Sequence, residues 1–580
     1  AFPPTQFYQK EPLWIVLSLA MIILVDLLII FLTNSIRVGS VIVPFVLFIF
    51  AVVVCVVYEF RGIPMMAPDI LTVQTATSVM GNYTFKLTFE QYSVILVCMA
   101  FFFTFLRLHE VKVIEKRVFH IAGFIVVALG CGLFTNQIIL SDFMEEHQIN
   151  IRMFRPMESY QKYGGVLTFA RSVGYAVVKK PEGYTTAKVD QIIQENEKKS
   201  ANEQQSTAKQ YPNIITVVNE TFADIKVLGD FKTNEDYMPY FHSLKKNCVT
   251  GYTYASIVGG QTANTEFELL TGNTLGFLSA GTTAFQLYIH GQMPSLVSNL
   301  KAEGYSGNKA MHPFNPYNYN RPAVYKDFGF ADFIDKFDFP KNVKRVREYI
   351  SDEANVDRII SEYEKNRKKT DQPFYMYNMT IQNHSPYDKD AANFKQPIKI
   401  ESSKYDAEAN RYLNLIKYSD DSLKQLTSYF EKCKEPTIIL FLGDHQPRLT
   451  DEFMNKITNG QYQTWSGEQM MKRYQVPFVI WANYDIKEQH IEKTSMNYIQ
   501  SILTQTAGVK MTGYQRFLNE VRKEVPTITS QGYWGKNGKF YQINDKGSPY
   551  YGIIQKYRMI QYNMMFDKKN RRDSFFEVSK

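Results

Sequence analysis

A short polar segment, GGQTANTEF at residues 259–267, places the hydroxyl of Thr262 in a glycine-led turn. At neutral pH a hydroxyl side chain is almost wholly protonated, and it is therefore a weak nucleophile. A divalent cation beside it changes this, because the cation favours the deprotonated oxygen as it does for bound water. Thr262 is thus a candidate nucleophile if the chain supplies metal ligands, and the candidates are Glu220, Asp444 and His445.

Strands must deliver those ligands, and four short apolar runs have the composition of buried strands: residues 214–218, 374–379, 437–442 and 476–481. Polar residues follow three of the runs: Glu220 the first, His384 the second, and Asp444 with His445 the third. Helical stretches lie between the runs, and this alternation predicts an α/β domain with a mostly parallel sheet and helices on both faces. In such sheets the carboxyl ends of the strands meet at one edge, where sites form.

The candidate ligands make a chemically consistent set. Glu220 and Asp444 offer carboxylates, His445 offers a nitrogen, and a deprotonated Thr262 would be a fourth ligand. Mostly hard donors of this kind suit manganese or magnesium, with zinc as an alternative. Each residue alone is weak evidence, because a glutamate at a strand end is usually solvated and an Asp-His pair is common. The joint pattern carries the prediction.

Composition excludes several classes of function. The chain has 580 residues and a net charge of +8, and it has no basic cluster interleaved with aromatics, so we expect no nucleic-acid partner. A mildly basic balance suits an anionic membrane surface better. Only Cys248 and Cys433 of the five cysteines fall in the polar part of the chain, and there is no C-x-x-C motif. We therefore expect neither a disulfide framework nor a cysteine zinc site.

The first 140 residues predict a transmembrane domain, with four apolar runs long enough to cross a bilayer: residues 13–32, 41–58, 92–108 and 118–140. The most basic loop near any run, residues 107–117, is placed in the cytoplasm by the positive-inside rule. Everything after about residue 140 is then extracytoplasmic, and so is residue 1. Because the chain begins at Ala1, we expect a fifth span ahead of it.

Two further regions follow the predicted spans. Residues 141–211 predict juxtamembrane helices and a polar linker. Residues 212–580 predict the catalytic domain, with a strand extension from about residue 520 in which residues 555–563 form a strand or hairpin.

Three motifs together resemble a known family. Glu220 ends a strand in the segment VVNETF at residues 217–222, Thr262 lies in a Gly-x-Thr-x-x-x-Glu-Phe pattern at residues 260–267, and Asp444 and His445 lie in a Gly-Asp-His pattern. The sequence resembles the lipoteichoic acid synthase type of phosphoglycerol transferase, in the alkaline phosphatase and sulfatase superfamily. The resemblance covers nearly the whole chain, from membrane spans through a linker to an extracellular sulfatase-like domain.

The resemblance implies further site residues. The family metal is usually manganese, held by residues matching Glu220, Thr262, Asp444 and His445. Its substrate pocket uses a histidine, an aromatic and an arginine, which match His312, Tyr319 and Arg321; the aromatic is typically Trp, so Tyr319 is a departure. A second histidine, in an Asn-His-x-Pro-Tyr pattern, matches His384 at residues 383–387 and would transfer protons. Without the motif context, a structural role would be the better interpretation of His312 and His384.

The resemblance also implies the reaction. Thr262 would attack the phosphorus of phosphatidylglycerol or a related lipid donor, diacylglycerol would leave, and a glycerophosphoryl-threonine would remain. An acceptor hydroxyl would then take the glycerol phosphate, as in lipoteichoic acid synthesis. The acceptor could be a glycolipid, a growing polymer or a wall polysaccharide. The expected location is the cell membrane of a Gram-positive-type bacterium, with several spans and an extracellular catalytic domain.

Four alternatives accompany that interpretation. A sulfatase would need a Cys or Ser in C-x-P-x-R or S-x-P-x-R, and neither motif occurs. A phosphoethanolamine transferase would also use a threonine, but such enzymes usually carry several disulfides. A glycerophosphate transferase that decorates a surface polysaccharide shares every motif and is the runner-up. A non-catalytic, membrane-anchored binder of the same fold is disfavoured by the intact nucleophile and ligand set.

Overall fold

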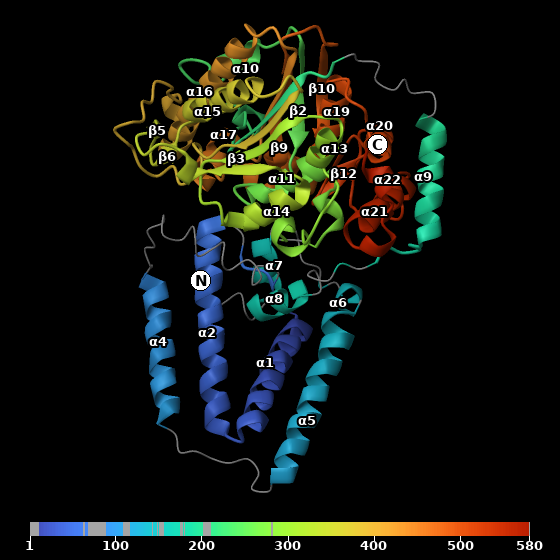
Figure 1. Cartoon of the computed structure of the whole chain (residues 1–580). Helices are drawn as coiled ribbons and strands as arrows, with labels where there is room; N and C mark the ends of the chain where they lie inside the picture. The colour runs from blue at the N-terminus through green and yellow to red at the C-terminus, as the bar shows by residue number, and fades with distance from the viewer. Residues whose placement is uncertain are drawn as a thin grey trace. The chain divides into compact units, whose positions relative to one another are not determined.

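The structure, a computed structural model, describes residues 11–61, 64–67, 89–107, 117–141, 143–147, 149, 156–173, 178, 180–200, 210–279 and 282–578. It divides into two units (Figure 1). The smaller comprises residues 1–178 with 279–282, and the larger comprises residues 179–278 with 283–580.

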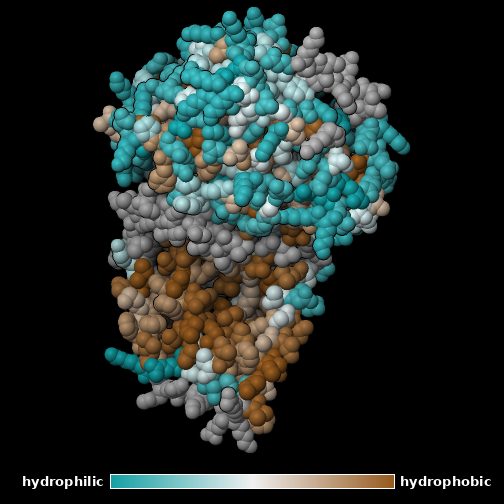
Figure 2. Space-filling model, viewed as in Figure 1, coloured by the Kyte–Doolittle hydropathy of each residue, from teal (hydrophilic) through white to brown (hydrophobic). Residues whose placement is uncertain are grey.

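Four long apolar helices dominate the smaller unit: α1 (Pro12–Thr33), α2 (Ile36–Arg61), α4 (Phe89–Leu106) and α5 (Arg117–Phe134). Among the described residues, three segments are long and apolar enough to cross a membrane: Pro12–Thr33, Ile36–Tyr58 and Val118–Ile139. They coincide with three of the four predicted spans, and their apolar surface is brown in Figure 2. The apolar part of α4 is shorter, Ile95–Leu106, so a fourth span stays a prediction. The loop from 108 to 116 lies outside the described residues.

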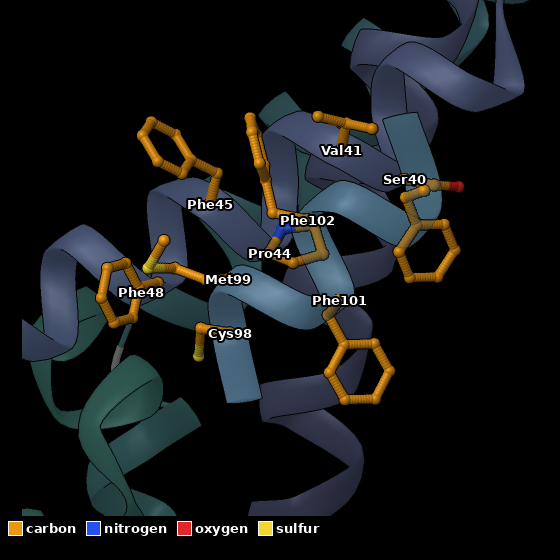
Figure 3. A pocket seen from close by; sticks show the side chains of 10 residues that line it. Ser40, Val41, Pro44, Phe45, Phe48, Cys98, Met99, Phe101 and Phe102 are labelled. Carbon is orange, nitrogen blue, oxygen red and sulfur yellow. The ribbon is translucent and has the colours of Figure 1, made fainter. Parts of the chain in front are cut away.

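Small residues let these helices approach closely. A Cβ on Gly123 of α5 would lie 2.3 Å from the ring of Phe31 on α1, and a Cβ on Gly39 of α2 would lie 2.5 Å from Ile30. Between α2 and α4 lies a pocket whose described lining is apolar or aromatic apart from Ser40 (Figure 3). Such a surface suits a lipid environment and offers no charged group for chemistry.

Shorter helices complete the smaller unit: α6 (Phe143–Glu146), α7 (Pro156–Tyr163) and α8 (Gly165–Val173). They pack on α1 and on the π-helical turn η3 (Thr135–Ile139) that follows α5. The shared cluster includes Leu17, Met144, Tyr163 and Leu167. Apolar contacts therefore tie these helices to the bundle.

An eight-stranded sheet forms the centre of the larger unit, in the order β10-β2-β9-β8-β1-β7-β3-β4. Its strands are β1 (Asn213–Asn219), β2 (Cys248–Tyr254), β3 (Ser306–His312), β4 (Asp332–Asp335), β7 (Phe374–Met379), β8 (Thr437–Gly443), β9 (Gln475–Ala482) and β10 (Gln489–Ser495). Only β9 runs antiparallel to its neighbours β2 and β8, which confirms the mostly parallel sheet. Every residue of β1, β7 and β8 is buried, because both faces of the sheet are covered.

Helices cover the sheet (Figure 1). α15 (Asp352–Arg367) packs on α16 (Ala407–Phe430), and α11 (Thr262–Thr271) packs on α19 (Met496–Thr506). The remaining helices are α9 (Thr186–Ser200), α10 (Pro239–Ser243), α12 (Ala284–Leu287), α13 (Leu296–Ala302), α14 (Arg321–Phe328), α17 (Asp451–Ile457), α18 (Gly467–Met470), α20 (Gly513–Glu524), α21 (Tyr551–Met565) and α22 (Asp573–Phe576). Two small sheets complete the unit: the hairpin β5 (Arg345–Val346) with β6 (Tyr349–Ile350), and β11 (Thr527–Thr529) with β12 (Gly532–Trp534) and β13 (Phe540–Tyr541).

The C-terminal prediction was wrong in one respect. Strands β11 to β13 do lie beyond residue 520, but residues 555–563 belong to helix α21 rather than to a strand. The buried residues of that helix include Ile554, Tyr557, Ile560 and Met564, which recur every three or four positions. That spacing is helical, and it lets α21 pack against α9 and α20.

Candidate active site

Adjacent strand ends bring the three predicted ligands together. β1 and β8 pair in parallel with Asn219 opposite Gly443, so Glu220 and Asp444 leave the sheet side by side. His445 Nε2 lies 3.2 Å from Asp444 Oδ2 and 3.9 Å from Glu220 Oε1. All three side chains are buried, and their ligand atoms lie within 4.8 Å of one another.

Glycine is required at position 443. A Cβ there would lie 1.8 Å from the carbonyl oxygen of Phe222, so any larger residue would force the two chain segments apart. The segment after β1 is equally constrained, since Thr221 has a left-handed φ of 54°. Its backbone N–H donates to Asp444 Oδ1 at 2.6 Å, and its hydroxyl donates to Glu220 Oε1 at 2.6 Å. Thr221 thereby aligns both carboxylates.

The donor atoms fit a divalent cation. Asp444 Oδ1 accepts the N–H groups of Thr221 and His445, whereas buried Oδ2 has no hydrogen-bond partner among the described residues. His445 Nδ1 lies 3.0 Å from the carbonyl oxygen of Gln446, which assigns the proton to Nδ1 and leaves Nε2 as an acceptor without a described partner. Burial and then the Asp444 carboxylate raise the pKa of Glu220. A cation at this point would relieve that repulsion.

Backbone and side-chain contacts hold the threonine turn against the ligands. Thr262 is the buried first residue of α11. The Thr265 hydroxyl, one turn along that helix, donates to the carbonyl oxygen of Asp444 at 2.8 Å, and Gly259 N–H donates to that of Gln446 at 2.9 Å. Gly259 and Gln261 have left-handed φ values of 70° and 64°, which reverse the chain at the start of the helix. The helix N-terminus adds positive potential near Thr262.

Two predicted histidines lie at the next strand ends. His312 ends β3, and its Nδ1 lies 3.0 Å from the Met379 carbonyl oxygen at the end of β7. His384 follows β7, and its Nδ1 lies 2.7 Å from the Ser385 carbonyl oxygen. Burial lowers the pKa of His384 to about 4 and that of His312 well below its usual 6.5. Both rings are therefore neutral at pH 7, with Nε2 the nitrogen that can accept a proton.

Arg321 is anchored by a buried ion pair. Its Nε and Nη2 donate to Glu266 Oε1 at 3.1 and 2.7 Å. Tyr325 and Tyr377 donate to the other carboxylate oxygen at 2.5 and 3.1 Å. The guanidinium carbon lies 5.1 Å from the centre of the Tyr319 ring. Glu266, which belongs to the threonine motif, thus orients Arg321 and leaves Nη1 as the nitrogen that can reach a ligand.

Sequence reasoning missed a polar network beneath the ligands. Asn383 Nδ2 lies 3.1 Å from Asn219 Oδ1, 3.0 Å from the Glu220 carbonyl oxygen and 2.8 Å from Ser419 Oγ. Asn219 and Ser419 in turn donate to Asp352 Oδ2 at 2.7 and 2.6 Å. Asn219 and Asn383 precede Glu220 and His384 directly, which is the signal that could have found them.

Arg347 is a second residue that the sequence did not indicate. Nη2 donates to the carbonyl oxygens of Gln382 and His384 at 2.8 and 2.7 Å, and Nη1 donates to that of Pro386 at 2.7 Å. The side chain therefore holds three carbonyl groups of the loop that carries His384. Arg347 itself sits in the β5–β6 hairpin with a left-handed φ of 54°.

The larger unit matches the family model described as Sulfatase over residues 212–509. The chain belongs to the sulfatase family. It is 30% identical over 433 residues to a Rhizobium meliloti protein named for cyclic beta-1,2-glucan modification, covering 73% of this chain and 65% of that protein. It is 22% identical over 374 residues to the lipoteichoic acid synthase of Staphylococcus saprophyticus, covering 62% of this chain and 55% of the synthase. The chain thus spans about two thirds or less of these relatives.

A solved structure shares the fold. It is the Streptococcus pyogenes phosphoglycerol transferase GacH in complex with sn-glycerol-1-phosphate, with a TM-score of 0.56, 20% identity, and coverage of 69% of this chain and 100% of that structure. The predicted resemblance to lipoteichoic acid synthase-type phosphoglycerol transferases, within the alkaline phosphatase superfamily, is confirmed.

The ligand set predicts that metal stabilises the protein. We expect Mn²⁺ to raise the melting temperature of the detergent-purified chain and a chelator to lower it; a ligand at 100 times its Kd adds about 2.7 kcal/mol. Because burial and the Asp444 carboxylate raise the pKa of Glu220, protons compete with the metal at that ligand, so the stabilisation should grow as the pH rises. Differential scanning fluorimetry from pH 5 to 8 measures both effects.

Two aspartate variants control that experiment. Asp444→Asn should lose the metal-induced shift. Asp420→Asn removes a buried carboxylate that instead accepts the N–H groups of Tyr240 and Phe241, so it should lower the starting melting temperature and keep the shift. An equal metal-induced shift in melting temperature in both variants would show that the metal binds at another site.

Arg347 should act by positioning His384. We expect Arg347→Met to lower kcat for a chromogenic phosphodiester roughly 10- to 100-fold, as loss of an outer contact to a site commonly does. The metal-induced shift in melting temperature should stay, because Arg347 contacts no ligand. Arg345→Met is the matched control, since exposed Arg345 donates to Glu348 within its own hairpin. Equal kcat values in the two variants would show that Arg347 does not position His384.

Proposed function

We propose that the protein is a membrane-bound phosphoglycerol transferase that moves glycerol phosphate from phosphatidylglycerol to an acceptor hydroxyl through a phosphothreonine on Thr262. The single observation that carries the proposal is the connection of the Thr262 turn to the ligand set. Thr265 and Gly259, on either side of Thr262, donate to the carbonyl oxygens of Asp444 and Gln446, which supports a Thr262 hydroxyl close to the ligand set of Glu220, Asp444 and His445.

The membrane setting supports this choice. The part of the chain that the structure describes has three helices long and apolar enough to cross a bilayer, and the basic sequence at 107–117 favours an extracytoplasmic catalytic domain in a multi-pass cell-membrane protein. Transfer from a lipid phosphodiester needs no ATP, which is absent outside the cell. The relatives named lipoteichoic acid synthase and phosphoglycerol transferase support a glycerol phosphate as the transferred group.

Thr262 carries the first half of the reaction. Glu220, Asp444, His445 and Thr262 would hold the cation, for which manganese is our first choice and magnesium or zinc the alternatives. When bound, the cation favours the deprotonated form of the Thr262 hydroxyl. The Thr262 oxygen forms a bond to phosphorus, and the bond from phosphorus to the diacylglycerol oxygen breaks. The proton that Thr262 gives up passes through His384 Nε2 to that oxygen, and diacylglycerol leaves.

His384 acts in the second half. Because burial keeps its ring neutral, Nε2 can accept the proton of the acceptor hydroxyl. The acceptor oxygen bonds to phosphorus, and the bond to Thr262 breaks. Arg321 Nη1 pairs with a phosphate oxygen, and His312 Nε2 accepts a hydrogen bond from a glycerol hydroxyl. Tyr319, stacked on Arg321, borders the same pocket.

A second candidate differs only in the acceptor. The relative with 30% identity is named for glucan modification, which favours addition of single glycerol phosphate units to a saccharide over polymerisation on a glycolipid. Phosphoethanolamine transfer is less favoured because all five cysteines are free thiols. The products separate the two leading candidates, since polymerisation gives a ladder of chain lengths and decoration gives single additions.

Removing the nucleophile should abolish the first half-reaction. We expect the purified chain with Mn²⁺ to release diacylglycerol from fluorescent phosphatidylglycerol, and Thr262→Ala to lower that rate at least about 1,000-fold. Thin-layer chromatography of the lipid product measures the release. Thr271→Ala is the matched control, because Thr271 lies on the same helix and its hydroxyl donates to the Phe267 carbonyl oxygen and accepts from Asn273 N–H, neither of which belongs to the candidate site.

The control outcomes are distinct. Thr262→Ala should keep most of its metal-induced stabilisation, which shows that the site is folded. Wild-type protein that binds metal and releases no diacylglycerol would reject phosphatidylglycerol as donor. Release by Thr262→Ala at the wild-type rate would reject the phosphothreonine.

A further inference from the structure

Two exposed aromatic rings stand beside the site. Among the described residues of the larger unit, the large apolar or aromatic side chains that are exposed are Tyr317 at 77%, Phe337 at 73% and Tyr405 at 46%. Tyr317 lies in the loop after β3, and Phe337 lies in the short turn η7 (Lys336–Asp338) after β4. Both follow the carboxyl ends of strands, at the edge that carries the candidate catalytic groups. Single exposed apolar residues are common on protein surfaces, so the position of these two at the edge that carries the candidate site, rather than their exposure alone, makes them candidates for substrate contact.

Short contacts connect Phe337 to the histidines. The register pairs His312 with Asp335, and Lys336 N–H donates to the Phe314 carbonyl oxygen at 3.4 Å. The Lys336 ammonium lies 5.0 Å from the Phe337 ring and 5.9 Å from the Phe314 ring. The Phe314 ring in turn lies 6.2 Å from His384, nearly parallel to it, and 6.1 Å from His312. The Phe337 ring therefore lies within a few sugar-ring lengths of the proton-transfer group, and Tyr317 belongs to the same loop as Phe314.

Polar groups around the rings suit a saccharide. The loop at residues 313–320, PFNPYNYN, holds asparagines, tyrosines and prolines and no charged residue. Beside Phe337 lie the carboxylates of Asp335 and Asp338 and the Lys336 ammonium. A sugar ring presents apolar C–H groups on its face and hydroxyls at its rim, so a flat aromatic ring flanked by hydrogen-bonding groups fits it.

A bilayer fits the same rings less well. Anionic lipid attracts a surface by about 1 kcal/mol for each lysine or arginine close to it. Around Phe337, the two carboxylates of Asp335 and Asp338 outnumber the single ammonium of Lys336. The local charge therefore opposes an anionic headgroup layer.

We propose that Tyr317 and Phe337 form a binding subsite for a saccharide acceptor, on which a sugar ring stacks while a neighbouring ring of the same chain presents its hydroxyl to Thr262-bound glycerol phosphate. This inference rests on the proposed transferase function and names the class of acceptor. It adds no covalent step to the reaction.

Two variants of Phe337 test the subsite. Phe337→Leu keeps apolar area and loses the aromatic face, whereas Phe337→Trp keeps that face. With fluorescent phosphatidylglycerol as donor and a linear β-1,2-linked glucose hexasaccharide as acceptor, we expect Phe337→Leu to raise the acceptor KM about 5- to 10-fold with kcat within about twofold. Phe337→Trp should restore the wild-type KM. With free glycerol as acceptor, which is too small to reach the rings, both variants should match wild type.

A binding measurement separates this proposal from the transferase function. Isothermal titration of the hexasaccharide alone into the detergent-purified chain needs no turnover, and binding should weaken in Phe337→Leu and Tyr317→Leu. Binding without any diacylglycerol release would keep the subsite and reject the proposed donor reaction. Unchanged binding and KM in both leucine variants would overturn the subsite. Equal losses with glycerol and hexasaccharide, together with weaker co-sedimentation with phosphatidylglycerol vesicles, would assign the rings to the membrane instead and also overturn it.

Discussion

Glu220 and Asp444 are carboxylates buried side by side, and the cost of keeping both charged governs how the site is built. Removing such groups from water costs several kcal/mol for each ion unless hydrogen bonds or a counter-charge compensate. Thr221 supplies part of the compensation through its N–H and hydroxyl. The remaining atoms, Asp444 Oδ2 and the nitrogen His445 Nε2, converge on one point. This arrangement of buried acceptor atoms would be stabilised by a positive charge at the candidate metal site.

Arg321 and Glu266 form a buried ion pair, which orients Arg321 rather than contributing to the candidate metal site. Glu266 is part of the threonine motif, yet its carboxylate points to Arg321, Tyr325 and Tyr377 rather than to the cation ligands. A planar guanidinium can give two nitrogens to one carboxylate and still present a third, which a lysine ammonium cannot do in a fixed direction. The pair therefore couples α11, which begins at Thr262, to α14, which begins at Arg321.

The sequence predicted the parts of the site that lie at strand ends, because parallel strands must bring Glu220, His384 and Asp444 to one edge whatever their separation along the chain. It could not predict Asp352 or Arg347. Asp352 contacts Asn219, which lies 133 positions away, and Arg347 contacts residues up to 39 positions away. Only tertiary packing creates these contacts, so no local sequence pattern indicates them. The helix at residues 551–565 was misread for another reason: glycine, tyrosine and asparagine hide its three- to four-residue burial period, which packing on α9 reveals.

The order of the strands places the candidate site residues in a row along one edge of the sheet. Reading β8, β1, β7, β3 and β4 across the sheet gives Asp444 and His445, then Glu220, His384, His312 and finally the turn that carries Phe337. Neighbouring strands lie about 4.8 Å apart, so this edge extends about 19 Å. The proposed lipid donor needs only the first part of that length. The part beyond His312 exceeds what a glycerol phosphate can occupy, and a substrate that uses it must be an extended acceptor whose distant end binds away from the reacting hydroxyl.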